Sequence, residues 1–181
     1  MLDEVKKRIW FYEFELPDGS ITQTNIPADV LRIHTSRRDK LRRVIAERVG
    51  DASNLTALDF ASHEGYFSFE LARHFGQVHG VEYRDESFAA CLAMQAALGV
   101  SNVTFTQGDL TKLTTNDIAP ADLVLVYGLL YHLENPIHVL RLASQLSKKH
   151  ILIETQIFPY DIAGKLEEGH YIWQREVSGV F

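Results

Sequence analysis

The sequence predicts an α/β fold in which a mainly parallel sheet carries helices on both faces. Short apolar runs alternate with segments of helical apolar spacing from Leu55 onward. Gly99 supplies a helix stop, and Asn135 followed by Pro136 supplies a helix start. Strands that alternate with helices pair in parallel through right-handed crossovers. We therefore expect a doubly wound, Rossmann-like sheet of five strands.

The repeating part of the chain contains eight predicted elements. Apolar side chains recur four apart at Phe67, Leu71 and Phe75, which is helical spacing and places these residues in the core. The predicted strands cover 55–59, 77–82, 103–107, 122–127 and 151–153, and the predicted helices cover 65–75, 85–98 and 136–147.

The first fifty residues differ in character from the rest. Two extended runs, 9–16 and 21–24, flank a Pro-Asp-Gly-Ser turn at 17–20 and predict a hairpin. A basic amphipathic helix is predicted over 39–49, with Gly50 as its stop. We expect residues 1–50 to cover the acceptor side of a ligand-binding domain formed by residues 51–155.

The end of the chain does not contain another strand–helix unit. Residues 171–173 suit either a short strand or a loop over the site, within a tail at 156–181. The run 151–153 would then form an exposed sheet edge, which favours association. We expect either a fragment or a short form whose edge is covered by its own tail or by a partner, such as a second copy in a homodimer.

Composition narrows the class of protein. The chain has 181 residues, 46% hydrophobic and 23% charged, which suits one globular unit with a sizeable core. A net charge of −6 argues mildly against broad phosphate binding. Cys91 is the single cysteine, so no internal disulfide forms. The sequence has neither the apolar core of a signal peptide nor a membrane-length apolar run, and predicts a cytoplasmic protein.

Three acids follow successive predicted strands. Asp59 ends the first strand, Glu82 ends the second, and Asp109 comes just after the third. All three are expected at the carboxyl edge of the sheet, where open α/β folds bind ligands. Glu82 falls where a ribose-binding acid is found in nucleotide folds. Asp109 is able to accept from an adenine amine, and Asp59 is expected close to the first turn.

The turn after the first predicted strand helps to distinguish between candidate ligands. A pyrophosphate site favours G-x-G-x-x-G, whereas residues 61–65 contain one glycine, Gly65, and an acid, Glu64. Glu64 and Asp59 would repel phosphate and favour a cation. S-adenosylmethionine carries a sulfonium, an amine, a ribose and an adenine, so it fits better than the dinucleotide of a dehydrogenase.

These motifs together resemble the class I S-adenosylmethionine-dependent methyltransferases over about residues 55–155. The resemblance rests on Asp59-x-Ala61-x-His63-x-Gly65, Glu82, Gly108-Asp109 and the run 122–133. It implies S-adenosylmethionine as cofactor and S-adenosylhomocysteine as product. It also implies cofactor contacts by Asp59, Ala61, His63, Gly65, Glu82, Tyr83, Gly108, Asp109, Leu110 and Tyr127.

The chain departs from this family in two ways. Ala61 and His63 stand where the family has glycine, and His63 adds a bulky ring beside the methionine part. The family's sheet usually continues with two further strands, one of them antiparallel, and this sequence ends before it can supply them. The segment at 10–19 and the run 128–136 further resemble the branch related to enzymes that modify the wobble uridine of tRNA.

Tyr131 and His132 follow the fourth predicted strand of the sheet, above the expected methyl group. A histidine suits a general base near neutral pH, so His132 is the candidate base and Tyr131 the candidate for orienting the acceptor. The alternative is that His132 packs or caps its loop, because many methyl transfers need only alignment.

Other motifs are weak. His63-Glu64 would begin a zinc-binding H-E-x-x-H helix, but Phe67 occupies the second histidine position, so we expect no metal site. The basic run 37–43 is expected to be a solvated helix face. Its alternative role is an RNA-binding patch aided by the aromatic residues at 10–12.

Three functions therefore remain open from the sequence. The first is a methyltransferase acting on a small-molecule acceptor. The second is a methyltransferase acting on a tRNA base. The third is a non-catalytic binding module whose cofactor site has degenerated through Ala61 and His63.

Overall fold

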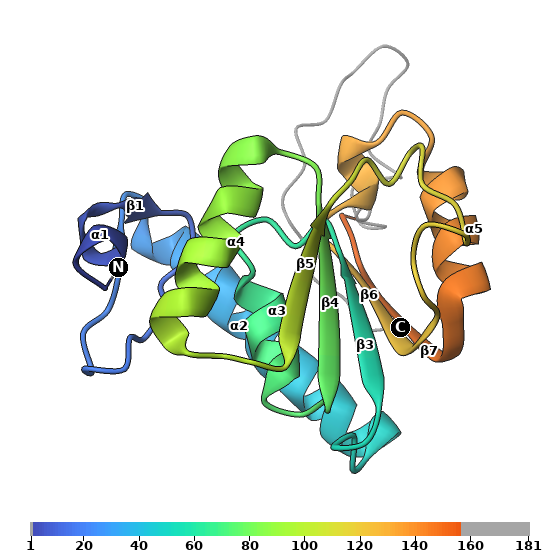
Figure 1. Cartoon of the computed structure of the whole chain (residues 1–181), viewed down its shortest axis with the longest axis horizontal. Coiled ribbons are helices and arrows are strands. Elements are labelled where there is room, and N and C mark those ends of the chain that lie inside the picture. The colour runs from blue at the N-terminus through green and yellow to red at the C-terminus, as the bar shows by residue number, and fades with distance from the viewer. Residues whose placement is uncertain (1, 157–181) are drawn as a thin grey trace, which may run out of the picture.

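The computed structural model describes residues 2–156 (Figure 1). The expected short strand or loop at 171–173, and the tail after Gln156 as a whole, lie outside the described residues.

The predicted five-stranded sheet is confirmed. Its strands are β3 (Thr56–Phe60), β4 (Gln77–Glu82), β5 (Val103–Gln107), β6 (Ala121–Tyr127) and β7 (Ser147–Glu154). Every pairing is parallel, and the strand order is β5-β4-β3-β6-β7. Strands β4 and β5 are therefore added on one side of β3, and β6 and β7 on its other side, so the strand order switches between β3 and β6. Ligand crevices of doubly wound folds form at such a switch point, beyond the carboxyl ends of the strands.

Helices cover both faces of the sheet. The helices α2 (Ala28–Val44), α3 (Tyr66–Ala72) and α4 (Asp85–Leu98) lie on one side, and α5 (Pro136–Leu146) lies on the other (Figure 1). A π-helical turn (Ile45–Val49) extends α2. Alternate strand residues serve the two cores: Leu123 and Leu125 pack with the α2–α4 layer, and Val124 and Val126 pack with α5.

The N-terminal hairpin is present only at its tip. Glu15 and Ile21 form one antiparallel bridge, but β1 (Ile9–Trp10) and β2 (Gln23–Thr24) pair in parallel. A full hairpin was therefore a wrong expectation. The reason is that side chains take the backbone donors of the first run: Glu64 accepts from Phe11 and Tyr12, and a threonine hydroxyl accepts from Phe14.

The alternation of the first run is nevertheless preserved. Trp10, Tyr12, Phe14 and Leu16 are buried, and the intervening residues face outward. These side chains join the core formed by α2, α3 and the sheet. A short helix, α1 (Leu2–Lys7), precedes them and was not predicted.

Two predicted starts were wrong by four residues or more, and the helix predicted over 65–75 is shorter, at Tyr66–Ala72. The helix expected over 39–49 begins at Ala28. Its middle is held by the ion pair of Arg37 with Glu154 of β7, a contact that local periodicity does not reveal. The strand expected over 151–153 begins at Ser147, where the polar Lys148 and Lys149 hide the strand pattern. Lys149 pairs with Asp122 at 3.1 Å, which secures this end of β7 against β6.

Within the described residues, β7 is one of the two edge strands of the sheet, with β5 at the other edge, and Ile153 of β7 is 46% exposed. No helix in residues 2–156 is both long and apolar enough to span a bilayer.

Candidate functional site

A cavity of about 620 Å³ lies at the carboxyl ends of the strands. Its walls come from the N-terminal segment, α2, the turn after β3, and the loops after β4, β5 and β6. Ten predicted site residues line it: Ala61, His63, Glu82, Tyr83, Gly108, Asp109, Leu110, Tyr127, Tyr131 and His132. Two others, Asp59 and Gly65, are not among the lining residues.

The turn at 61–65 has glycine-type geometry without its glycines. Ala61 has φ 57° and His63 has φ 53°, the two positive values among non-glycine residues in the described part of the chain. Both fall in the left-handed region, which costs an L-residue roughly 1–2 kcal/mol. The turn is held by Ser62 N donating to Val81 O at 3.0 Å. The surrounding structure therefore imposes the conformation that glycine would adopt freely.

Gly65 is the N-cap of α3, and the structure leaves no room for a side chain at this position. Its φ is 83°, and a Cβ there would stand 2.7 Å from Cε2 of Phe69. A glycine at position 65 therefore allows both the positive φ and the close packing of Phe69 where the turn meets the helix.

Glu82 is the best-oriented acid of the site. Its two carboxylate oxygens accept one backbone hydrogen bond each, from His63 N at 2.8 Å and from Arg84 N at 2.9 Å. The side chain is buried, yet it lines the cavity. A carboxylate offers about four acceptor positions, so both oxygens keep lone pairs for further donors.

Asp59 is buried near the end of β3, just before the turn. Its Oδ2 accepts a hydrogen bond from Ser68 Oγ at 2.6 Å. Burial raises the pKa of this carboxyl to about 7, and the Ser68 hydroxyl opposes that rise. Asp59 therefore joins β3 to α3 and is not among the residues that line the cavity.

Asp109 faces the cavity but is already engaged. Its Oδ1 accepts from the Thr111 hydroxyl at 2.6 Å and from Thr111 N at 3.0 Å, and Lys112 lies 3.0 Å from its Oδ2. The Thr111 hydroxyl, followed by Lys112, lowers the pKa of Asp109 to about 2. The acid thus organises the loop that lines this wall.

Glu64 is not among the residues that line the cavity. It is 5% exposed, and its Oε2 accepts from Phe11 N at 2.9 Å and Tyr12 N at 3.3 Å. Burial raises its pKa, and these two hydrogen bonds oppose the rise. Glu64 therefore ties the N-terminal segment to the turn, and an effect of its charge on the ligand stays a prediction.

His63 stands within a group of rings. Its ring centroid lies 5.1 Å from that of Phe11 and 5.7 Å from that of Tyr12. Both of these rings also contact His34 of α2, at 4.8 Å and 4.6 Å. Burial lowers the pKa of His63 and of His34 to about 4, and Nδ1 of each is buried with no hydrogen-bond partner among residues 2–156. The imidazoles are therefore neutral at physiological pH.

Tyr131 and His132 lie on a 3-10 turn, Leu130–His132, after β6. Both line the cavity, and their ring centroids are 4.4 Å apart. His132 is exposed, so its imidazole is open to exchange protons with solvent.

The geometry can now be compared with known proteins. A family described as methyltransferase domain matches residues 51–175, which is more than half of the 181 residues. The chain belongs to the methyltransferase-domain family. This confirms the predicted family, and it leaves the tRNA-modifying branch unconfirmed. No curated protein sequence matches the chain.

Solved structures share the fold of this methyltransferase domain. EvdMO1 is 24% identical with a TM-score of 0.66, covering 85% of this chain and 33% of that chain. Its N-terminal domain with SAH bound is 21% identical with a TM-score of 0.63, covering 85% and 61%. Magnesium protoporphyrin IX methyltransferase from Synechocystis PCC 6803 with bound SAH is 19% identical with a TM-score of 0.64, covering 85% and 74%. The chain thus spans less than two thirds of either EvdMO1 chain.

Several lining residues of the methyltransferase domain were missed from the sequence. Arg37 had been assigned to a solvated basic face, but its guanidinium lines the cavity and pairs with Glu154 at 2.9 Å. Glu154 raises the pKa of Arg37 against the effect of burial. No local signal could identify a pair separated by 117 positions. The other missed lining residues are Phe11, Tyr12, Phe67, Val81, Arg84, Thr111, Gly128, Leu129 and Leu133.

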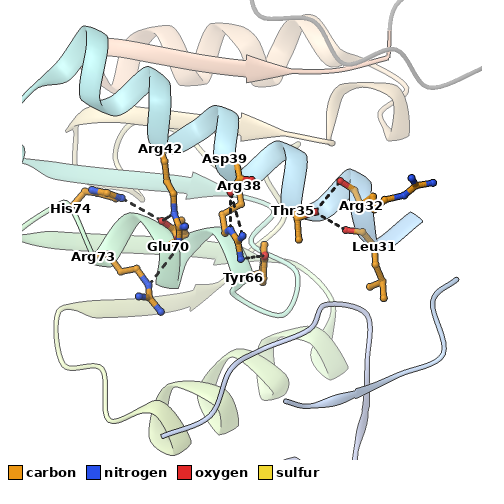
Figure 2. Close-up of polar contacts among 10 residues, drawn as sticks. All are labelled: Leu31, Arg32, Thr35, Arg38, Asp39, Arg42, Tyr66, Glu70, Arg73 and His74. Atoms are coloured by element: carbon orange, nitrogen blue, oxygen red, sulfur yellow. Dashed lines mark hydrogen bonds and ion pairs between the residues drawn. The ribbon is translucent and has the colours of Figure 1, made fainter. Parts of the chain in front are cut away.

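Much of the basic run at 37–43 is paired within the domain (Figure 2). Arg42 makes two bonds to Glu70, from Nε at 2.6 Å and from Nη2 at 2.8 Å. Arg38 pairs with its neighbour Asp39 at 3.2 Å. The expected patch of exposed rings was also wrong, because only Phe11 of residues 10–12 is exposed. Within residues 2–156 no cluster of three or more acids, histidines or cysteines has metal-binding geometry.

Proposed function

We propose that the protein is an S-adenosylmethionine-dependent methyltransferase acting on a small-molecule acceptor. The observation that carries this proposal is Glu82 at the end of β4, a buried carboxylate held by two backbone N–H groups at the wall of the cavity. A fixed carboxylate with free lone pairs suits the two hydroxyls of a ribose.

The other walls fit the rest of such a nucleoside. Leu110 and Val81 offer apolar contacts for a base, and Gly108 N donates to Glu82 O, which fixes the β5 loop beside it. On the opposite side, Phe67 and Tyr127 form an edge-to-face pair at 5.3 Å. Aromatic faces attract cations, so such walls suit a sulfonium. We infer a nucleoside end at Glu82 and an acceptor end at Tyr131 and His132.

The reaction would be an in-line displacement. When bound, S-adenosylmethionine supplies an activated methyl group: a carbon–acceptor bond forms as the carbon–sulfur bond breaks. The protein's contribution is mainly alignment. An acceptor O–H or N–H also loses a proton, and His132, which lines the cavity, is the base that we propose for it.

A small acceptor agrees with the shape of the site. The cavity volume of about 620 Å³ lies within the range of sites for single small ligands. Two structural neighbours also support a small acceptor. The N-terminal domain of EvdMO1 was crystallised in the presence of SAH and D-fucose, and coclaurine N-methyltransferase was crystallised bound to N-methylheliamine and SAH. A tRNA acceptor stays a prediction with less support, since Arg37 and Arg42 engage acids of this chain.

Isothermal titration with S-adenosylhomocysteine tests the proposal. We expect saturable binding that Glu82→Gln weakens by about tenfold or more, because a hydrogen bond to a charged group contributes roughly 1.5–3 kcal/mol. The exposed Glu47→Gln is the matched control and should bind as the wild type does. Absence of binding at millimolar ligand would favour a non-catalytic module and contradict the proposal.

Three further experiments test the parts of this proposal. Mass spectrometry of cell extract incubated with the protein and S-adenosylmethionine should identify a methylated product. On that acceptor, His132→Ala should lower turnover; unchanged turnover would contradict the base role. Sedimentation tests the proposed homodimer through β7, which Ile153→Lys should weaken.

A further inference from the structure

The clearest feature that the methyl-transfer proposal leaves unexplained is Glu64. Glu64 belongs to the turn yet does not line the cavity, and one carboxylate oxygen, Oε2, accepts from two successive backbone donors, Phe11 N and Tyr12 N. A buried carboxylate needs such donors, because an unpaired buried charge is costly. Segments more than fifty positions apart are thereby joined through one oxygen atom.

The two residues that Glu64 holds both form part of the cavity wall. Phe11 is 37% exposed and lines the cavity, and Tyr12 lines it from a buried position. Their rings lie between the imidazoles of His34 and His63. Tyr12 is also stacked on Tyr66 at 4.6 Å between centroids. The packing fixes the rings, and Glu64 fixes the backbone that carries them.

Glu64 is also joined to the acid of the nucleoside end. Its neighbour His63 donates its backbone N–H to Glu82 Oε2 at 2.8 Å. A continuous path therefore runs from the Glu82 carboxylate through the His63–Glu64 backbone and the Glu64 carboxylate to Phe11 N. Ligand contacts at Glu82 and the position of the N-terminal wall are expected to depend on each other along this path.

We propose that Glu64 is a positioning residue that holds Phe11 and Tyr12 as the N-terminal wall of the cavity and couples that wall to the turn and Glu82. This inference rests on the proposed function for the identity of the ligand. Glu64 holds the wall because its side chain is long enough for one oxygen to accept from two N–H groups at once. Charge alone is not sufficient for this role.

Hydrogen exchange of the full chain tests the proposal at the two amides concerned. Glu64→Ala should speed exchange of the Phe11 and Tyr12 amides by about tenfold or more in the ligand-free protein. In the wild type, S-adenosylhomocysteine should slow exchange of these amides, and Glu64→Ala should remove that response. Glu13→Ala, an exposed acid on the same segment, is the matched control and should leave both results unchanged.

Two conservative variants separate reach from charge. Glu64→Gln keeps the length and an acceptor oxygen, so it should retain most of the wild-type protection and the response to ligand. Glu64→Asp keeps the charge but is one methylene shorter, so it should behave like the alanine variant. The opposite order would overturn the proposal. These two variants also decide the question if the alanine variant does not fold.

The outcomes distinguish this inference from the proposed function. If the wild type does not bind S-adenosylhomocysteine, the function fails while the ligand-free exchange of Glu64→Ala still tests the wall. If the wild type binds and the Phe11 and Tyr12 amides exchange equally in wild type and Glu64→Ala, the positioning role is wrong and the function stands.

Discussion

Arg37 donates through Nη2 to Glu154 Oε1 at 2.9 Å, which joins the middle of α2 to the carboxyl end of β7. The two side chains are only 11% and 10% exposed. Within the part of the chain that the structure describes, Arg37 Nε and Glu154 Oε2 are buried without hydrogen-bond partners, so the hydrogen-bonding capacity of the pair is not fully used there. A buried pair of this kind is sensitive to the loss of one member.

Replacing one partner should therefore be costly. Arg37→Met or Glu154→Gln should each lower the free energy of unfolding by about 3–5 kcal/mol, because an uncompensated buried group remains. The double variant should lose less than the sum of the two. Urea denaturation in a double-mutant cycle measures this coupling, with Arg32→Met on the exposed face of α2 as control. Additive losses would show that the pair is energetically independent.

The left-handed turn predicts an unusual response to glycine. Ala61→Gly should be neutral or stabilising, because relief of about 1 kcal/mol of backbone strain offsets the added chain entropy. Ala93→Gly, at an exposed position inside α4, should instead cost about 1 kcal/mol. Thermal and urea unfolding of both variants checks the contrast. Equal losses at the two positions would contradict strain at Ala61.

The buried imidazoles predict a dependence of stability on pH. The pKa of His34 and of His63 is about 4 in the folded protein, against 6.5 as the ordinary value. The unfolded chain therefore binds more protons between these values, so stability falls as pH drops from 6.5 toward 4. Each imidazole contributes a slope of at most ~1.4 kcal/mol per pH unit. His34→Leu should flatten the curve measured by urea denaturation, and an unchanged slope would contradict this assignment.

Asp59 should act with the opposite sign. Its pKa is raised from 3.8 to about 7, so the folded protein binds the extra proton between these values and stability falls as pH rises through them. Asp59→Asn removes this contribution. Relative to the wild type, the variant should gain stability between pH 4 and pH 7, by up to ~1.4 kcal/mol per pH unit. A constant difference across that range would contradict the raised pKa.

The regular part of the fold was predictable because its signals are local. The bounds of β4, β5 and α4 coincide with the predicted ranges, where apolar periodicity and helix stops lie within the elements themselves. The order of acids along the chain also placed Glu82 and Asp109 at one cavity. Parallel strands bring their carboxyl ends to one edge, so chain position alone is informative there.

The other features of the fold and site could not be predicted, because they depend on contacts between residues far apart in the sequence. The hairpin expectation failed because Glu64 takes backbone donors of Phe11 and Tyr12 from more than fifty positions away. Arg37 was assigned to solvent because its partner Glu154 lies on the last described strand. Helix α2 was underestimated for the same reason. Each error involves a polar side chain whose partner is set by tertiary structure.

The positive φ values at Ala61 and His63 have a consequence for how such loops evolve. The backbone at 61–65 is braced from outside, by Val81 O on Ser62 N and by the Cys91 thiol donating to His63 O at 2.9 Å. A braced loop can exchange its glycines for larger residues and keep its path. The recognisable signature is then lost before the shape, and substitutions at bracing positions such as Cys91 should disturb the loop more than substitutions within it.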